Sequence, residues 1–281
     1  MFFDYWPVLF VDDEADVLAI SKLAMKNFEV YGLPIKIYTS ASKAEAIQLL
    51  QNNAEVACSL AVAFLDVVME NDHAGLELCN YIRNEMGNNT TQIFIRTGQA
   101  GLAPEREVID KYDIAGYFSK VELTHNKLYS VVKSSVRQYL AYGMAQATIE
   151  LLNNLVAALG SRQKILYAVH SVAGMSDKQA DTPRWLIVNG DVLFADEVDV
   201  DRALAVQKRL SALRGVPLNP YGDSYVRDEE GYQQIQVTSG PSKASTSFLF
   251  KSRFAPPESI IGMMHSFTTG LAIAWQQSIL R

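Results

Sequence analysis

The sequence predicts an α/β protein of two domains, in which a doubly wound parallel sheet precedes an α+β domain with an antiparallel sheet. In the first half, short apolar runs alternate with longer segments of helical periodicity, the pattern of a (βα)5 sheet covered on both faces. In the second half, an Asn-Gly pair between two apolar runs predicts a hairpin. The 281 residues fit two domains of roughly 150 residues each, and we place them at residues 1–140 and 141–281.

Five strands and the helices between them are predicted in the first half. The strands are short apolar runs at residues 8–11, 34–38, 60–65, 92–96 and 116–119. The first two helices are predicted over residues 15–30 and from a cap at Ser40 or Ser42 to about Gln51. The next two are predicted over residues 76–85 and from Pro104 onward. Residues 124–160 are predicted to be helical almost throughout, as a dimerising signalling helix or as two helices that pack into their own domains.

The second half is predicted to alternate helices with hairpins. The expected elements are a helix over 162–175, a hairpin of 185–188 and 192–195 around Asn189-Gly190, a helix over 199–213, a loop over 215–224, a hairpin of 232–238 and 246–251, and a helix over 258–280.

Composition and charge exclude several classes of protein. Hydrophobic residues make up 49% of the chain and charged residues 20%, which is typical of a folded globular protein. Residues 1–140 hold 18 acidic and 12 basic side chains against 13 of each in 141–281, so the net charge of −6 lies in the first half and argues against a DNA partner. With two cysteines, no basic leader and no apolar run near the about 20 residues of a membrane span, we expect a cytoplasmic protein with no membrane partner.

Polar side chains follow the predicted strands of the first half at the point where each strand ends. Asp12 and Asp13 follow the first strand, Asp66 the third, Thr97 the fourth and Lys120 the fifth. The carboxyl ends of parallel strands meet at one edge of a sheet, so these side chains are expected to lie together. Gathered carboxylates suit Mg²⁺, and a hydroxyl and an ammonium group complement phosphoryl oxygens. The pattern predicts a phosphoryl-transfer site.

The motifs at these strand ends resemble those of the receiver domain of two-component response regulators, over residues 6–140. They read Val-Leu-Phe-Val-Asp12-Asp13-Glu, Phe-Leu-Asp66-Val-Val-Met, Arg-Thr97-Gly and Gly-Tyr117-Phe-Ser-Lys120. The chain departs from the family at Val121, where many receivers have Pro. Residues 96–114 resemble more closely a subgroup of receivers that precedes a domain of unknown function and often an HD-GYP cyclic-di-GMP phosphodiesterase.

The resemblance implies a flavodoxin-like fold and a role for each of these residues. Asp66 would be the phosphoacceptor, and Asp13, Asp66 and the backbone carbonyl of Val68 would bind Mg²⁺, with Asp12 holding the metal through water. The remaining implied roles are contacts to the phosphoryl group from Thr97 and Lys120 and an aromatic switch at Tyr117.

The order of elements in residues 141–281 is similar to that of GAF or PAS-type sensory domains. We therefore expect a response regulator phosphorylated by a histidine kinase or phosphotransfer protein. Its output would be contact with an unknown downstream protein or homodimerisation, with no enzymatic activity beyond phosphorylation and autodephosphorylation of the aspartate.

Two alternatives stay open. The second domain could sense a small molecule, with the receiver secondary, or the chain could be a truncated relative of the cyclic-di-GMP phosphodiesterases. Aromatic residues that could line a small-molecule pocket are Trp185, Phe194, Tyr221, Tyr225 and Tyr232, and His170 and His265 are lone candidate ligands.

Overall fold

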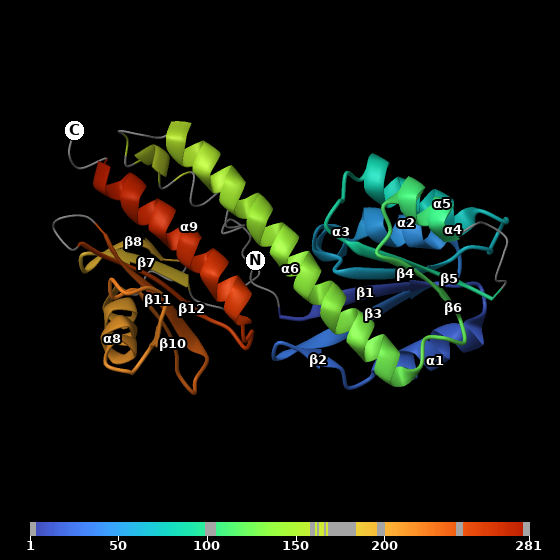
Figure 1. Cartoon of the computed structure of the whole chain (residues 1–281), viewed down its shortest axis with the longest axis horizontal. Helices are drawn as coiled ribbons and strands as arrows, with labels where there is room; N and C mark the ends of the chain where they lie inside the picture. Colours follow the sequence, from blue (N-terminus) through green and yellow to red (C-terminus); the bar gives the residue numbers. More distant parts are fainter. Residues whose placement is uncertain are drawn as a thin grey trace. The chain divides into compact units, whose positions relative to one another are not determined.

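The computed structural model divides the chain into two compact units, Phe3–Tyr142 and Gly143–Arg281 with the first two residues (Figure 1). The residues that the structure describes are 4–98, 105–157, 161, 163–165, 167, 184–195, 200–239 and 244–277. The helix expected over 162–175 lies almost wholly outside the described residues.

The first unit is built on a six-stranded sheet of order β2-β3-β1-β4-β5-β6. Its strands are β1 (Trp6–Val11), β2 (Glu29–Val30), β3 (Leu33–Ser40), β4 (Val62–Asp66), β5 (Gln92–Thr97) and β6 (Gly116–Ser119). Five of them are parallel, which confirms the predicted α/β sheet. The sixth, β2, was not predicted and pairs antiparallel with β3, because Tyr31 and Gly32 both have positive φ (52° and 78°) and turn the chain back within two residues.

Helices cover both faces of this sheet (Figure 1). They are α1 (Ala15–Met25), α2 (Lys43–Asn52), α3 (Ala54–Ser59), α4 (Ala74–Asn80), the π-helical turn η1 (Tyr81–Glu85), α5 (Glu105–Tyr112) and α6 (His125–Ala157). Ser42 caps α2 by accepting a hydrogen bond from the backbone N–H of Glu45 at 3.1 Å. The prediction missed α3, a six-residue helix that Asn53 caps through the N–H of Val56. It also began α4 two residues late and gave no π-helical turn.

The alternation of side chains along the strands gives the sheet two apolar faces. Leu9, Leu65 and Ile95 point to the face covered by α2 to α5, where they form one buried cluster with residues of those helices. On the opposite face, aromatic rings stack from strand to strand, with centroids 4.7–5.8 Å apart; they belong to Phe10, Phe64, Phe94 and Phe118. Both faces are therefore packed, and polar side chains gather at the strand ends.

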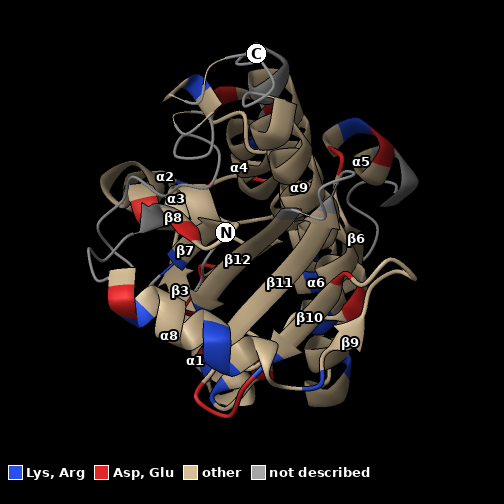
Figure 2. Ribbon diagram, turned by 90° about the vertical axis from the view of Figure 1, so that its left-hand side faces the viewer, with Lys and Arg blue, Asp and Glu red and all other residues tan. Residues whose placement is uncertain are grey.

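The second unit contains an antiparallel sheet of order β8-β7-β12-β11-β10-β9. Its elements are β7 (Arg184–Val188), β8 (Asp191–Ala195), α8 (Val200–Ser211), β9 (Val216–Pro217), β10 (Ser224–Arg227), β11 (Tyr232–Ser239), β12 (Ala244–Lys251) and α9 (Glu258–Gln277). Strand β11 carries no charged residue, whereas α8 carries both signs (Figure 2). The fold class predicted for this half, α+β with an antiparallel sheet, is confirmed.

Both predicted hairpins form. Asn189 and Gly190 have φ of 51° and 88°, the left-handed pair that a two-residue turn of this type requires. The loop predicted over 215–224 was wrong in part, because it contains β9 and reaches the first residue of β10. The last predicted helix is found to Gln277, and its final residues lie outside the described part of the chain.

Candidate functional site

The carboxyl ends of four parallel strands bring the predicted polar residues to one edge of the first unit's sheet. Asp12 follows β1, Asp66 ends β4, Thr97 ends β5 and Lys120 follows β6. The register aligns these ends, since Asp66 lies opposite Arg96, the residue before Thr97.

Three carboxylates meet at this edge. One oxygen each of Asp12, Asp13 and Asp66 lies within 4.8 Å of the others. Asp12 and Asp66 are 2% and 4% exposed, whereas Asp13 is exposed. An oxygen-only donor set that is open on one side fits a hard divalent cation such as Mg²⁺, which binds through one or two carboxylates and keeps several waters. Val68 is half-buried two residues after Asp66, and its carbonyl as a fourth donor stays a prediction.

Lys120 joins these carboxylates. Its Nζ lies 2.8 Å from Asp66 Oδ2 and 3.1 Å from the carboxylate of Asp12. It also donates to Glu14 Oε1 at 2.6 Å, a partner that the sequence argument did not use although Glu14 adjoins the acidic pair. Burial lowers the pKa of Lys120, but hydrogen bonds to these carboxylates outweigh it and hold the pKa above its ordinary value. Lys120 is therefore a permanent cation in the site.

Asp66 is in the opposite situation. Burial raises the pKa of its carboxyl, and Lys120 opposes this through a hydrogen bond and its charge. The nearby charge of Asp12 adds to the upward shift. An aspartate that is buried among other carboxylates is costly to keep ionised, which is typical of functional sites.

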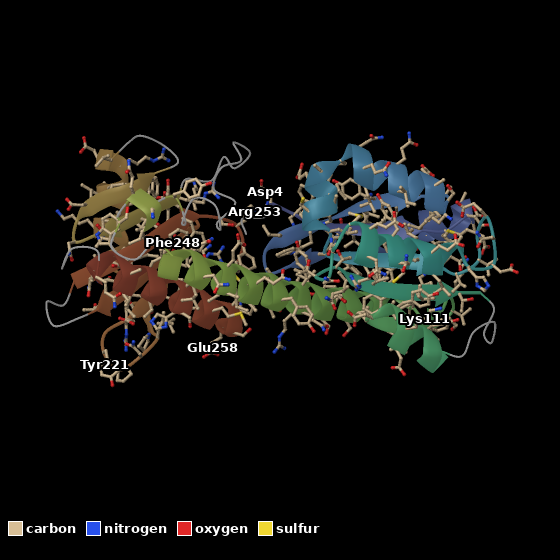
Figure 3. All side chains as sticks on the ribbon, turned by 90° about the horizontal axis from the view of Figure 1, so that it is seen from above. Asp4, Lys111, Tyr221, Phe248, Arg253 and Glu258 are labelled. Carbon is tan, nitrogen blue, oxygen red and sulfur yellow. The ribbon has the colours of Figure 1, made fainter. Side chains whose placement is uncertain are left out.

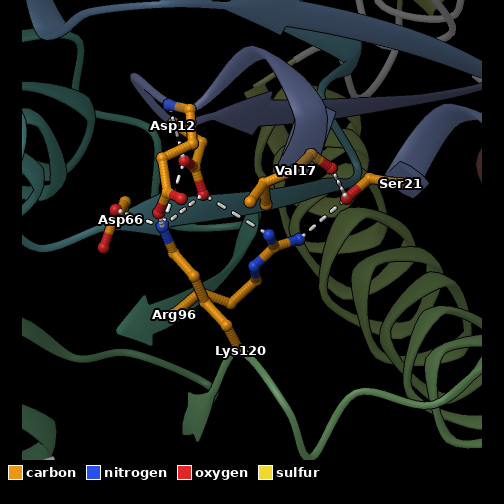
Figure 4. Close-up of polar contacts among 7 residues, drawn as sticks. Asp12, Val17, Ser21, Asp66, Arg96 and Lys120 are labelled. Carbon is orange, nitrogen blue, oxygen red and sulfur yellow. Dashed lines mark hydrogen bonds and ion pairs between the residues drawn. The ribbon is translucent and has the colours of Figure 1, made fainter. Parts of the chain in front are cut away.

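A second buried cation, Arg96, completes the electrostatics (Figure 4). Its guanidinium Nη2 lies 3.4 Å from Asp12 Oδ2, and the residue is 7% exposed. From sequence, Arg96 was placed at the end of an apolar strand and in the Arg-Thr97-Gly motif, but was given no role. The sequence did contain a signal for this role, which is a charged residue at the end of an otherwise apolar strand. A charge that is buried there needs a partner of opposite charge.

Gly75 is a further residue that the sequence argument did not single out. A Cβ atom at this position would lie 1.8 Å from the backbone oxygen of Asp66, so only glycine lets α4 begin this close to the end of β4. Its N–H donates to the carbonyl of Val67 at 3.1 Å. Gly75 thus fixes the backbone next to Asp66.

Thr97 and Tyr117 lie where the strand order predicts. Thr97 is 1% exposed at the end of β5, and its carbonyl accepts a hydrogen bond from the N–H of Lys120 at 2.9 Å. Tyr117 is half-buried on β6 and packs against the core cluster beneath α2 to α5. Its role as a switch stays a prediction. Val121, at the position where many receivers have Pro, is 87% exposed.

The candidate ligand residues of the second unit are distributed between core and surface. Trp185, Tyr225 and Tyr232 are at most 7% exposed and belong to the packed interior, whereas Tyr221 is 83% exposed on the loop before β10 (Figure 3). The side chain of Phe194 and all of His170 lie outside the described residues.

His265 has a partner that the sequence did not reveal. Its Nε2 lies 2.7 Å from Oδ2 of Asp223, which is 4% exposed. Asp223 also accepts hydrogen bonds from the Asn219 side chain and from the N–H of Thr238. Among the described residues, this cluster ties the β9–β10 loop to β11 and α9.

None of the described helices has the length and apolarity that a membrane span requires. No family model matches the sequence. The chain is 40% identical over 134 residues to the 3′3′-cGAMP-specific phosphodiesterase 2 of Vibrio cholerae serotype O1, a stretch that is 48% of this chain and 25% of that protein. The match thus spans a quarter of the length of that relative.

Two receiver domains of solved structure are similar to about half of this chain at low sequence identity. The signal receiver domain of an HD domain-containing protein from Pseudomonas fluorescens Pf-5 is 16% identical with a TM-score of 0.42, over 50% of this chain and 94% of that one. The receiver domain of the histidine kinase CKI1 from Arabidopsis thaliana, solved with Mg²⁺ and BeF3⁻, is 19% identical with a TM-score of 0.36, over 46% and 89%. The first unit of this chain is an α/β domain with an acidic pocket at the carboxyl edge of its parallel strands.

Proposed function

We propose that the chain is a response regulator that a histidine kinase or phosphotransfer protein phosphorylates on Asp66. The observation that supports this is the convergence of three carboxylates within 4.8 Å with the Lys120 ammonium 2.8 Å from Asp66. Such a site binds a divalent cation and a phosphoryl group together, and phosphoryl transfer asks a protein mainly for positioning and charge neutralisation.

In the proposed reaction, a carboxylate oxygen of Asp66 attacks the phosphorus of a phosphohistidine. A P–O bond forms, the P–N bond breaks, and the leaving imidazole takes up a proton. Asp13, Asp66 and the Val68 carbonyl would hold Mg²⁺, with Asp12 holding it through water, and the cation would neutralise phosphoryl oxygens. Lys120 and Thr97 bind the remaining oxygens of the product, and Lys120 exchanges part of its contact with Asp66 for the new group.

We further propose that the output is protein contact, with a downstream partner or between two copies of the chain, through the second unit. The burial of Trp185, Tyr225 and Tyr232 in its core supports contact over ligand binding by these residues. A small molecule that co-purifies with the full chain would favour the sensory alternative. We propose no enzymatic activity beyond phosphoryl transfer at Asp66, and hydrolysis of a cyclic dinucleotide by the purified chain would contradict this.

Phosphorylation with acetyl phosphate and Mg²⁺ tests the site directly. Intact-mass spectrometry should detect one labile phosphoryl group on the wild type and none on Asp66→Asn, because the amide is not a nucleophile. Asp72→Asn is the matched control, since Asp72 is exposed six residues further along and outside the acidic pocket. Equal labelling of Asp66→Asn and wild type would sink the proposal.

A further inference from the structure

Arg96 is a buried cation whose hydrogen bonds and packing hold it in one place. Strand alternation puts it on the same face of β5 as Phe94, the face toward α1. Its Nη1 donates to Ser21 Oγ at 3.0 Å, and that hydroxyl donates in turn to the Val17 carbonyl of α1 at 2.8 Å (Figure 4). The guanidinium carbon lies 5.5 Å from the centre of the Phe10 ring. The side chain therefore cannot swing out to solvent without losing these contacts.

The charge of Arg96 is directed at the acidic pocket. The contact of Nη2 with Asp12 Oδ2 at 3.4 Å is its ion pair. Burial lowers the pKa of Arg96, and the charges of Asp12, Asp66 and Glu14 oppose this by favouring the charged guanidinium. The Phe10 ring adds a cation–π attraction, but neither it nor the neutral Ser21 hydroxyl offsets the cost of burying a full charge. A buried charge is costly unless opposite charges surround it, so the pocket accounts for this residue type.

The formal charges show what the cation does. Asp12, Asp13 and Asp66 carry three negative charges against the two positive charges of Lys120 and Arg96, which leaves one negative charge. Glu14 is left out because it lies outside the group of three carboxylates that could hold the metal and because its side chain is 62% exposed to screening solvent. A bound divalent cation makes the sum one positive charge, and replacing the Asp66 carboxylate by a phosphoryl group of about −2 brings it to about zero.

We propose that Arg96 is a fixed counter-cation of this pocket, which weakens Mg²⁺ binding to the unphosphorylated site and leaves the metal-loaded site positively charged toward an anionic phosphoryl donor. Without Arg96, the metal-loaded site would be neutral and the phosphorylated site negative. The inference rests on the proposed function, and Arg96 acts in it as a positioning and charge-balancing residue that does not itself react.

Two properties of the full-length protein test this. Isothermal titration with MgCl₂ measures metal affinity, and mass spectrometry measures the rate of labelling by acetyl phosphate at saturating Mg²⁺. In Arg96→Met we expect about tenfold tighter Mg²⁺ binding, because one unit of like charge several ångström from a divalent cation is worth at least that factor at intermediate dielectric. Labelling should become several-fold slower, because the site no longer attracts the anionic donor. Arg96→Lys keeps the charge and should restore both values toward wild type.

Ser21→Ala serves as the matched control, since it removes the hydrogen bond that anchors Arg96 to α1 and leaves every charge in place. Its Mg²⁺ affinity should change much less than that of Arg96→Met. Unchanged or weaker Mg²⁺ binding in an Arg96→Met protein with wild-type circular dichroism would overturn the inference, as would equal tightening in the Met and Lys variants. If the wild type itself neither binds Mg²⁺ nor is labelled, the proposed function fails and the Arg96 inference falls with it.

Discussion

Among single residues, Asp66 best shows how this site balances opposing forces. Burial and the neighbouring Asp12 favour its protonated form, whereas Lys120 favours the carboxylate. The net result is a pKa above the ordinary value, so ionised Asp66 destabilises the folded state. Its neighbour Asp12 has several partners, because it accepts hydrogen bonds from the Glu14 N–H and from Lys120 and pairs with Arg96. The residue proposed to react is thus the one whose ionised form lowers the stability of the fold.

This cost predicts a pH-dependent gain of stability in Asp66→Asn. Because the folded-state pKa lies above the unfolded value, protonated Asp66 contributes stability that is lost as the pH rises through the folded pKa. The amide of Asp66→Asn cannot ionise, so the variant does not lose this stability at pH 7. Lys120 still pairs with Asp12 and Glu14. We expect a melting temperature higher by roughly 2–4 °C at pH 7, which corresponds to about 1 kcal/mol at this size. The difference should shrink toward pH 4.

Thermal unfolding followed by circular dichroism at pH 7 and pH 4.5 measures this difference. Asp72→Asn removes an exposed carboxylate and should match wild type at both values. A lower melting temperature for Asp66→Asn at pH 7 would show that the Lys120 pair outweighs burial.

At the scale of elements, apolar runs of four or more residues were predictable, and the two-residue strands and the six-residue helix α3 were not. The parallel strands and the Asn189-Gly190 hairpin follow from local sequence patterns, which can be recognised without knowing the neighbouring strands. Strands β2 and β9 have two residues each, too few for any periodicity, and exist only through pairing with a neighbour. The buried Trp6 ring also contacts β2, because its Nε1 donates a hydrogen bond to the Val30 carbonyl at 2.8 Å. The local sequence of β2 does not reveal this contact.

The same distinction applies to the site. Asp12, Asp13, Asp66 and Lys120 could be brought together from sequence, because parallel strands align their carboxyl ends. The ion pair of Arg96 with Asp12 could not be predicted from sequence. Strand alternation shows which face of the sheet Arg96 lies on, but not the direction in which its long side chain extends. Gly75 was equally hidden, because its importance depends on the distance between two backbone segments.

The approach of α4 to β4 gives a prediction about Gly75→Ala. The added methyl group would meet the Asp66 carbonyl oxygen at 1.8 Å and its carbon at 2.7 Å, both backbone atoms that cannot rotate away. We expect the free energy of unfolding to fall by about 3 kcal/mol, the upper end for an overpacked site. Gly143→Ala in α6 is the matched control, because a Cβ there meets nothing within 4 Å and should stabilise the helix by about 0.5–1 kcal/mol. Urea denaturation checks both signs, and a Gly75→Ala protein as stable as wild type would contradict the close approach.

At the scale of the whole molecule, one helix belongs to both units. Helix α6 runs unbroken from His125 to Ala157, whereas the division between the units falls between Tyr142 and Gly143. The acidic pocket lies entirely in the first unit, and the output is proposed for the second. If the output proceeds through the second unit, as proposed, this helix of 33 residues is one covalent element along which a change at the pocket can reach it.

This continuity predicts where a phosphoryl mimic acts. Beryllofluoride with Mg²⁺ should change amide hydrogen exchange around Asp66 and also along residues 143–157 of α6 in the wild type. Gly143→Pro removes a helical hydrogen bond and interrupts α6 at the division between the units, at a cost of about 3 kcal/mol to the helix. In this variant the change around Asp66 should persist while the change beyond residue 143 is lost, and Asp66→Asn should show neither. Because Gly143→Ala keeps the helix intact, it should respond as wild type does. An unaltered response beyond residue 143 in the proline variant would mean that coupling between the units does not depend on the helix.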